Sequence, residues 1–179
     1  MAGNQHAKTL EQRLRAVEDR LDILNLIASH PPSADTGADY YTRAVYTEDG
    51  VFDRGKGLDG AVGAAAIGAF TLTPAHQKAI HGGLAHLAAL PHIRLDGDRA
   101  WVTSYVQILH PDREAPLREL ANHGSTHGYR VHRIVANRWT LVRTADGWKI
   151  RSRYMEPIDG TQPARDILAG ALEDYRPKP

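Results

Sequence analysis

Apolar residues near the N-terminus recur every three or four positions, at Leu10, Leu14, Val17, Leu21, Leu24 and Ile27. This is the spacing of one face of a helix. Thr9, followed three residues later by Gln12, fits a capping box that satisfies the first free amides of such a helix. Two prolines follow at positions 31 and 32, and a residue before proline disfavours the helical conformation. We therefore predict a helix over residues 9–29 and a loop from there to Asp35.

Between Asp35 and residue 85 the pattern predicts short helices and a short strand. A helix over residues 38–46 would turn Tyr41, Ala44 and Val45 inward, and a turn at residues 47–50 would lead into a short strand at 51–53. Small residues from Leu58 to Phe70 indicate a third, closely packed helix.

From residue 85 the pattern alternates with a period of two, which is typical of strands. Turn residues divide this region, and the predicted strands cover residues 93–95, 100–110, 129–144 and 148–156. Residues 111–127 read as a loop with one helical turn, and residues 162–175 as an amphipathic helical tail. Helices followed by an antiparallel meander predict an α+β fold, with helices covering one face of a curved sheet. We expect one domain over residues 1–179, with its core at about 10–158.

Composition narrows the class of protein without naming a function. The 179-residue chain has a formal net charge of +1 and scattered charges, which gives no reason to expect nucleic acid as a partner. It has no cysteine, which excludes disulfides and thiolate nucleophiles. We expect neither a signal peptide nor a membrane span, and hence a cytoplasmic location.

Several segments, taken in order, resemble the SnoaL-like branch of the nuclear-transport-factor-two-like superfamily over residues 10–158. They are Ile23-Leu-Asn-Leu-Ile27, the aspartate at position 35, Tyr46-Thr-Glu-Asp-Gly-Val-Phe-Asp53, His86 with Ile93-Arg-Leu-Asp-Gly-Asp-Arg-Ala100, and Leu141-Val-Arg-Thr-Ala-Asp-Gly-Trp-Lys-Ile150. The resemblance implies a cone-shaped α+β barrel with a deep apolar cavity, assembled as a homodimer or homotrimer. Similar members include scytalone dehydratase, the bile-acid dehydratase and the lindane dehydrochlorinase, which are cofactor-free lyases.

The same resemblance implies four catalytic candidates. Asp35 takes the place of the aspartate of an aspartate–histidine dyad, and His86 takes the place of the histidine. His30 lies where relatives carry tyrosine or lysine, and Arg153 matches an arginine on the last strand of the dehydrochlorinase. A histidine oriented by a carboxylate is suited to act as a general base near neutral pH.

Each candidate also has a structural interpretation. Asp35 would serve as the N-cap of the following helix, and His30 would interact with the dipole at a helix C-terminus. His86 would be a polar residue at a strand edge. Strict alternation places Arg153 on the face opposite Trp148 and Ile150, unless a bulge intervenes.

Other residues are candidates for contact with substrate, although aromatic residues at such positions are more often ordinary core. They are Tyr41, Phe52, Trp101, Tyr105, His110 and Asn137. The ten histidines allow a metal site in principle, but no His-Glu-x-x-His pattern occurs. We therefore expect neither a metal nor another cofactor. The sequence contains no Gly-x-Ser-x-Gly motif, so it gives no indication of a serine hydrolase.

These observations favour a cofactor-independent lyase, of dehydratase type, that acts on a hydrophobic, hydroxylated, aromatic or polycyclic small molecule. The alternatives are an isomerase or cyclase of the same fold, and a noncatalytic ligand-binding or structural subunit. An enzyme should hold Asp35 within hydrogen-bond reach of His86 beside an enclosed void. A structural subunit should fill that space or keep the two residues apart.

Overall fold

A computed structural model describes residues 9–176 of the chain. Helices precede most of the strands, and their order along the chain is α1 (Leu10–Ala28), α2 (His30–Thr36), α3 (Asp39–Val45), β1 (Tyr46–Asp53), β2 (Ala61–Val62), α4 (Ala64–Phe70), α5 (Pro74–His81), β3 (Ala85–Ala88), β4 (His92–Asp96), β5 (Arg99–Pro111), β6 (Arg118–Leu120), β7 (Gly124–Thr126), β8 (Tyr129–Thr144), β9 (Gly147–Pro157), α6 (Gln162–Gly170) and the 3-10 turn η1 (Glu173–Tyr175). The predicted α+β class is confirmed.

Seven strands form one curved sheet in the order β2-β1-β9-β8-β5-β3, with β4 also paired to β5. The sheet is mixed, because β1 runs parallel to β9 while the other pairs are antiparallel. The expected antiparallel sheet is therefore corrected at this strand, and the expected barrel is an open cone whose sheet does not close.

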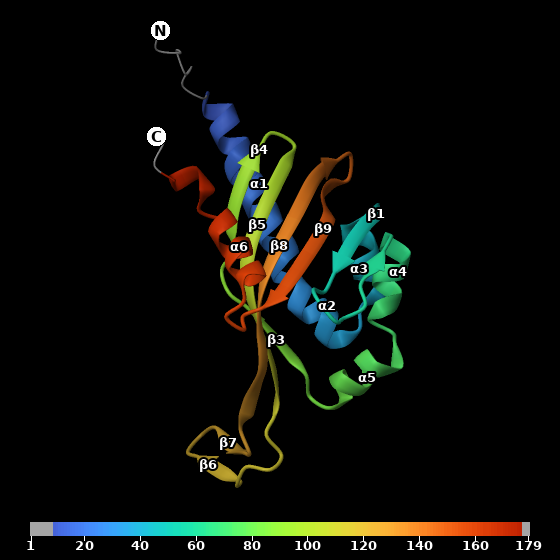
Figure 1. Cartoon of the computed structure of the whole chain (residues 1–179), viewed down its shortest axis with the longest axis vertical. Coiled ribbons are helices and arrows are strands. Elements are labelled where there is room, and N and C mark those ends of the chain that lie inside the picture. Colours follow the sequence, from blue (N-terminus) through green and yellow to red (C-terminus); the bar gives the residue numbers. More distant parts are fainter. Residues whose placement is uncertain (1–8, 177–179) are drawn as a thin grey trace.

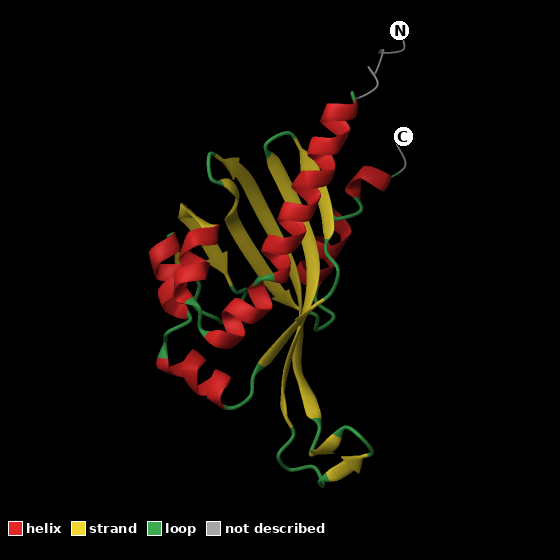
Figure 2. Cartoon of the chain, turned by 180° about the vertical axis from the view of Figure 1, so that it is seen from behind, coloured by secondary structure: helices red, strands yellow, loops and turns green. Residues whose placement is uncertain are grey.

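The helices lie on both faces of this sheet. Helix α1 crosses the inner, concave face (Figure 2), where Ile23 and Ile27 join the main core with Trp139 and Leu141. Helix α6 covers part of the outer face (Figure 1) and packs its Ala164 and Ile167 against β8. None of the helices in the described range is long and apolar enough to cross a membrane.

Strands β5 and β8 continue beyond the body of the protein as a two-stranded arm, which ends in the small hairpin of β6 and β7 (Figure 1). The predicted loop over residues 111–127 thus contains this hairpin and no helical turn. The side chains of the hairpin strands are exposed. The arm therefore adds little to the main core.

The first helix matches its prediction in extent, but its buried face differs. Thr9 and Gln12 form the capping box, so this part of the prediction is confirmed. The predicted apolar face is wrong over its first three turns, because the side chains of Leu10, Leu14, Val17 and Leu21 are at least half exposed. That half of the helix is instead fixed by Asp19, which is buried and accepts hydrogen bonds from Trp148 and Arg143.

Three further local predictions are corrected. The expected loop after residue 29 is helix α2, because Pro31 and Pro32 occupy its first turn, where a missing amide hydrogen costs nothing. The helix expected from Leu58 starts only at Ala64, after Gly63 in a left-handed backbone conformation. In helix α3, Ala44 is exposed rather than inward-facing. Helix α5 was not predicted, although Thr73 and Pro74 form a recognisable helix start.

Candidate active site

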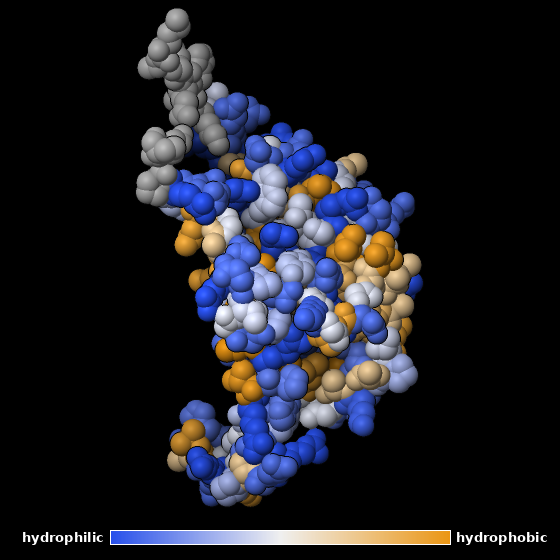
Figure 3. Space-filling model, in the orientation of Figure 1, coloured by the Kyte–Doolittle hydropathy of each residue, from blue (hydrophilic) through white to orange (hydrophobic). Residues whose placement is uncertain are grey.

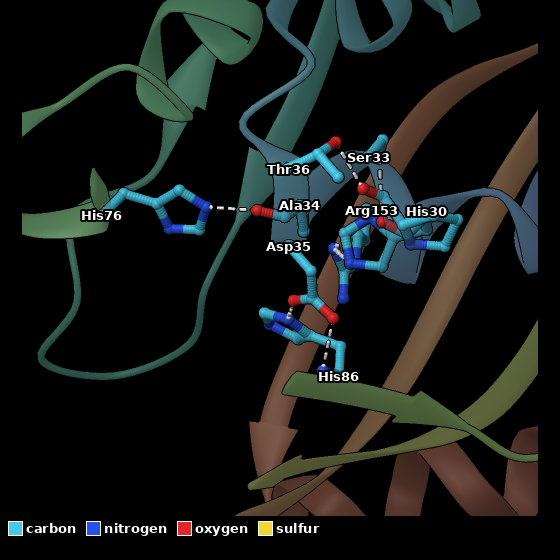
Figure 4. Close-up of polar contacts among 9 residues, drawn as sticks. His30, Ser33, Ala34, Asp35, Thr36, His76, His86 and Arg153 are labelled. Carbon is cyan, nitrogen blue, oxygen red and sulfur yellow. Dashed lines mark hydrogen bonds and ion pairs between the residues drawn. The ribbon is translucent and has the colours of Figure 1, made fainter. Parts of the chain in front are cut away.

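Asp35 and His86, fifty-one positions apart, meet where helix α2 packs against strand β3. The Asp35 Oδ1 atom lies 2.5 Å from His86 Nδ1, and Oδ2 accepts the backbone N–H of His86 at 2.8 Å (Figure 4). An ionised carboxylate only accepts hydrogen bonds, so Nδ1 carries the hydrogen and Nε2 carries the lone pair of the neutral ring. The carboxylate thus fixes both the position and the tautomer of the imidazole.

The structural interpretations of these two residues are not supported. Asp35 lies inside α2, and helix α3 has Ala38 at its N-cap position with no side-chain capping bond. The capping role predicted for Asp35 is therefore wrong. The His86 side chain is 11% exposed and lines the main cavity, so it is not a solvated strand-edge residue.

A second cluster surrounds Arg153, whose guanidinium is buried on the inner face of β9. Its Nη1 donates to His30 Nε2 at 2.7 Å, while Nε and Nη2 donate to Asn137 Oδ1 at 2.9 and 2.8 Å. The same group lies 4.2 Å from the ring centre of Trp139, within cation–π distance. Within residues 9–176, Arg153 forms no ion pair with a carboxylate. The cavity wall therefore holds a positive charge supported by neutral groups.

Burial sets the protonation of this cluster. It lowers the pKa of Arg153 to about 10 and raises the pKa of Tyr46 to about 12. Burial, and then the charge of Arg153, lower the pKa of His30 well below its ordinary value. At neutral pH, Arg153 is therefore charged while His30 and Tyr46 are neutral. A neutral His30 is also what allows its Nε2 to accept the hydrogen bond from Arg153.

The position of Arg153 depends on a β-bulge. Thr140 pairs with Ser152 and Leu141 pairs with Ile150, so Arg151 has no partner in the ladder. This extra residue reverses the alternation of β9 and brings Arg153 to the same face as Ile150. The two clusters are adjacent on that face, since the His30 and His86 ring centres are 5.9 Å apart. Asn137 lies behind the guanidinium, and its buried Nδ2 has no partner among the described residues.

The cavity beside both clusters has a volume of about 570 Å³. It lies between the inner face of the sheet and helices α1 to α5, and most of its wall is apolar. The apolar lining residues include Leu26, Val45, Phe52, Ile67, Phe70, Leu84, Val106, Ile108, Val135, Ile150 and Met155. The volume is that of a small-molecule site.

The candidates for substrate contact separate into two groups. Tyr41 and Phe52 line the cavity. Trp101 and Tyr105 lie on the outer face of β5, because residues of odd number in this strand point away from the core. We therefore exclude these two from the candidate site.

The remaining two candidates also lie outside the cavity lining. His110 is in the arm, where Nδ1 is 3.1 Å from the carbonyl oxygen of Pro111. Asn137 is fully buried and touches Arg153 rather than the void. Asn137 therefore supports the guanidinium of Arg153 and does not contact a ligand in the cavity.

Six ionisable lining residues were not among the candidates for catalysis or substrate contact: Tyr46, Arg54, Asp59, His76, His132 and Arg133. His76 comes from α5 and its Nε2 lies 2.8 Å from the carbonyl oxygen of Ala34, which fixes α5 against α2 (Figure 4). The helix-start signal at Thr73 would have placed His76 on a helix. Nothing in the local sequence distinguishes Arg54 or Arg133 from other strand arginines.

No group of three or more histidine, aspartate or glutamate side chains is placed to bind a metal ion within the described part of the chain. His123 and His127, spaced like helical ligands, lie instead in the arm, and each has its Nδ1 near a backbone carbonyl oxygen. Strand β7 separates the two residues, so they do not share a helix face.

Comparison with known proteins identifies the family. A SnoaL-like domain matches residues 15–154. The chain belongs to the SnoaL-like family. Members of this family are often enzymes, among them isomerases, cyclases and dehydratases. A search of curated proteins gives no significant match.

Solved structures agree with this SnoaL-like assignment. An NTF2-like protein with a cystatin-like fold from Novosphingobium aromaticivorans is 31% identical, with a TM-score of 0.77 over 93% of this chain and 99% of that one. A protein of the same organism, provisionally named an aromatic ring hydroxylase, is 26% identical, with a TM-score of 0.55 over 79% and 90% of the two chains. ActVI-ORFA from Streptomyces coelicolor is 22% identical, with a TM-score of 0.56 over 79% and 98%, and supports the fold alone.

Proposed function

We propose that this SnoaL-like protein is a cofactor-independent lyase that eliminates water from a hydrophobic, hydroxylated, aromatic or polycyclic small molecule. The observation that carries the proposal is the 2.5 Å contact between Asp35 and His86 at the wall of an apolar cavity. The pair supplies an oriented base, and the cavity supplies a mainly apolar site that a hydrophobic substrate can fill. The resemblance to homodimeric and homotrimeric relatives extends the proposal to a homo-oligomer.

In the proposed reaction, Nε2 of His86 takes a proton from a carbon next to a carbonyl or aromatic group. The electron pair of the broken C–H bond forms the new double bond, and the C–O bond on the neighbouring carbon breaks. The leaving oxygen departs with the electrons of that bond. Asp35 is the positioning residue, because its carboxylate stabilises the imidazolium that forms.

Arg153 lies where negative charge develops. A fixed guanidinium in a water-poor cavity stabilises an enolate, a phenolate or a departing oxygen more strongly than it would in water. His30 and Asn137 hold this group in place from two sides. They therefore act on the reaction through Arg153.

The pKa of His30 bears on the source of the second proton. Because burial and Arg153 keep His30 neutral, it is a poor acid at neutral pH. We assign the return of the proton to His86, whose imidazolium gives the hydrogen removed from carbon to the departing oxygen as water. A single residue then acts first as base and afterwards as acid, and the enzyme ends the cycle unchanged.

A substrate screen tests this proposal. Purified protein is incubated with hydroxylated aromatic and steroid-like compounds, and mass spectrometry follows the loss of one water. We expect His86→Gln to slow turnover by about 10²–10⁴-fold, the usual contribution of a general base. Asp35→Asn should slow it by at least about 10-fold, because both Asp35 oxygens accept hydrogens from His86 and an amide offers only one acceptor.

The control is His123→Gln, which changes a histidine in the exposed hairpin region. It should leave turnover unchanged. A product of unchanged mass that depends on His86 would indicate an isomerase or cyclase instead of a lyase. Turnover that persists in both His86→Gln and Asp35→Asn would refute the dyad.

A further inference from the structure

The charged lining of the cavity is unbalanced. Three arginines, Arg54, Arg133 and Arg153, line it together with four histidines. Of the described lining residues, Asp59 is the one acid. Asp35 is engaged by His86 and does not line the void. A mainly apolar cavity with this excess of positive charge is suited to a ligand that brings a negative charge.

Arg153 is held by the neutral groups described above, but the other two arginines are not held in this way. Arg54 follows strand β1, and its Nη1 makes one long contact, 3.4 Å, to the backbone oxygen of Asp59. Its guanidinium lies 4.6 Å from the centre of the Phe70 ring. Arg133 makes no side-chain hydrogen bond or ion pair within residues 9–176. Neither guanidinium forms an ion pair with a carboxylate in that range.

A second β-bulge brings Arg133 to the cavity. Ile108 pairs with Arg133 and Leu109 pairs with Val131, so His132 is left without a partner in the ladder. Consecutive residues of a regular strand point to opposite faces, yet His132 and Arg133 both line the cavity. The bulge therefore turns two basic side chains toward one space at the point where the arm leaves the body.

Arg54 and Arg133 also influence one another. Burial lowers the pKa of Arg54, the charge of Arg133 lowers it further, and the carboxylate of Asp59 raises it. Two partly buried, like-charged groups that face one cavity destabilise each other. An anion between them would remove this repulsion and would receive charge-assisted hydrogen bonds from planar donors that match a carboxylate.

We propose that the substrate carries a carboxylate, which binds between Arg54 and Arg133 while its apolar body occupies the cavity beside His86. This inference rests on the proposed function, because it names the class of substrate for the same site. The two arginines are substrate-positioning residues. They orient the molecule through a group that takes no part in the reaction, and Arg153 remains free to meet the charge that develops during the reaction.

Binding of two simple probes tests the inference. Calorimetry compares 2-naphthoate with its uncharged methyl ester on the full-length protein. We expect 2-naphthoate to bind at least 10-fold more tightly than the ester. Arg54→Gln and Arg133→Gln should each weaken naphthoate binding by about 10-fold, and the ester should bind all variants equally, which also shows that the cavity is folded.

The matched control is Arg99→Gln, which removes one positive charge from an exposed position at the start of β5. It should leave the affinity for naphthoate unchanged. Naphthoate binding requires no elimination step, so binding that depends on the two arginines stands even if no elimination is ever detected. The inference is overturned if naphthoate does not bind more tightly than the ester, or if Arg54→Gln and Arg133→Gln leave its affinity unchanged. In either case, elimination from an uncharged compound would remain to be tested by the screen.

Discussion

The two faces of the main sheet each carry a hollow, and the two hollows differ in how their charges are satisfied. The outer one, about 450 Å³, lies between strands β4, β5, β8 and β9 and the segment α6–η1. There Arg94 contacts Asp174 at 3.3 Å and lies over the ring of Trp101. The inner one places Arg153 against neutral groups and aromatic rings.

The two hollows also differ in the polarity of the side chains around them. Figure 3 views the protein from the outer side, and most side chains over the middle of that face are hydrophilic. The inner hollow is walled mainly by apolar side chains. A cation without a carboxylate is costly in such a place, because desolvation is not offset by an opposite charge. An uncompensated buried charge, rather than the size of a hollow, therefore distinguishes a candidate site.

The largest expected effect comes from removing the buried charge of Arg153 together with Asn137, which accepts its hydrogen bonds. In Arg153→Met with Asn137→Leu, the proposed elimination should fall by at least about 10²-fold, as after loss of an oxyanion donor. The free energy of unfolding should rise by about 1–4 kcal/mol, because well-packed apolar residues replace a desolvated cation and its amide. Urea denaturation measures the second effect. A less stable double variant would mean that Arg153 serves the fold.

The matched change on the outer face is Arg94→Met. The ion pair with Asp174 is largely exposed, so its loss should alter stability by less than about 1 kcal/mol. Turnover should stay within about twofold. A loss comparable to that of the inner variant would erase the difference drawn between the two faces.

The next expected effect is on stability alone and concerns His30 and pH. Its folded-state pKa lies below the unfolded value of about 6.5. Below that pH the unfolded chain binds a proton that the folded protein does not, so stability is present above pH 6.5 and falls as the pH decreases. The slope reaches about 1.4 kcal/mol per pH unit. Urea denaturation at several pH values should show that His30→Gln removes this slope, whereas parallel profiles would contradict the assignment.

The smallest effect is expected at an aromatic residue of the outer face. Tyr105 is 44% exposed, so Tyr105→Ser should change stability by no more than about 0.5 kcal/mol and turnover by less than about twofold. Phe52→Leu is the inner counterpart and removes a ring from the cavity wall and from beside Arg153. Equal effects of the two variants on turnover would show that the outer face takes part in function.

Much of this fold is readable from local pattern. The capping box of α1 and the long strand over residues 129–144 are found where they were predicted. Periodicity over many residues and turn signals define such elements. Short helices were read less well, since α2 begins with two prolines and α5 has few apolar residues.

The face on which a residue lies was harder to predict than the strand that carries it. Alternation defines two sets of residues in β5 but does not say which set is inward, and Trp101 and Tyr105 belong to the outer one. Asp35 and His86 were paired through resemblance to a family, because no local signal joins residues fifty-one positions apart. Arg153 was placed correctly only on the condition of a bulge, and its position depends on one unpaired residue.

The unpaired residue Arg151 has a consequence for how such a pocket diversifies. Every residue beyond it on β9 keeps its inward or outward orientation only while Arg151 stays outside the ladder. Pairing it in a regular ladder would exchange the two rows, turning Ser152 and Tyr154 inward and Arg153 outward, whereas deleting it would leave both rows as they are. In this architecture a shift of register at one point would change the chemistry of a wall that many separate substitutions would otherwise be needed to alter.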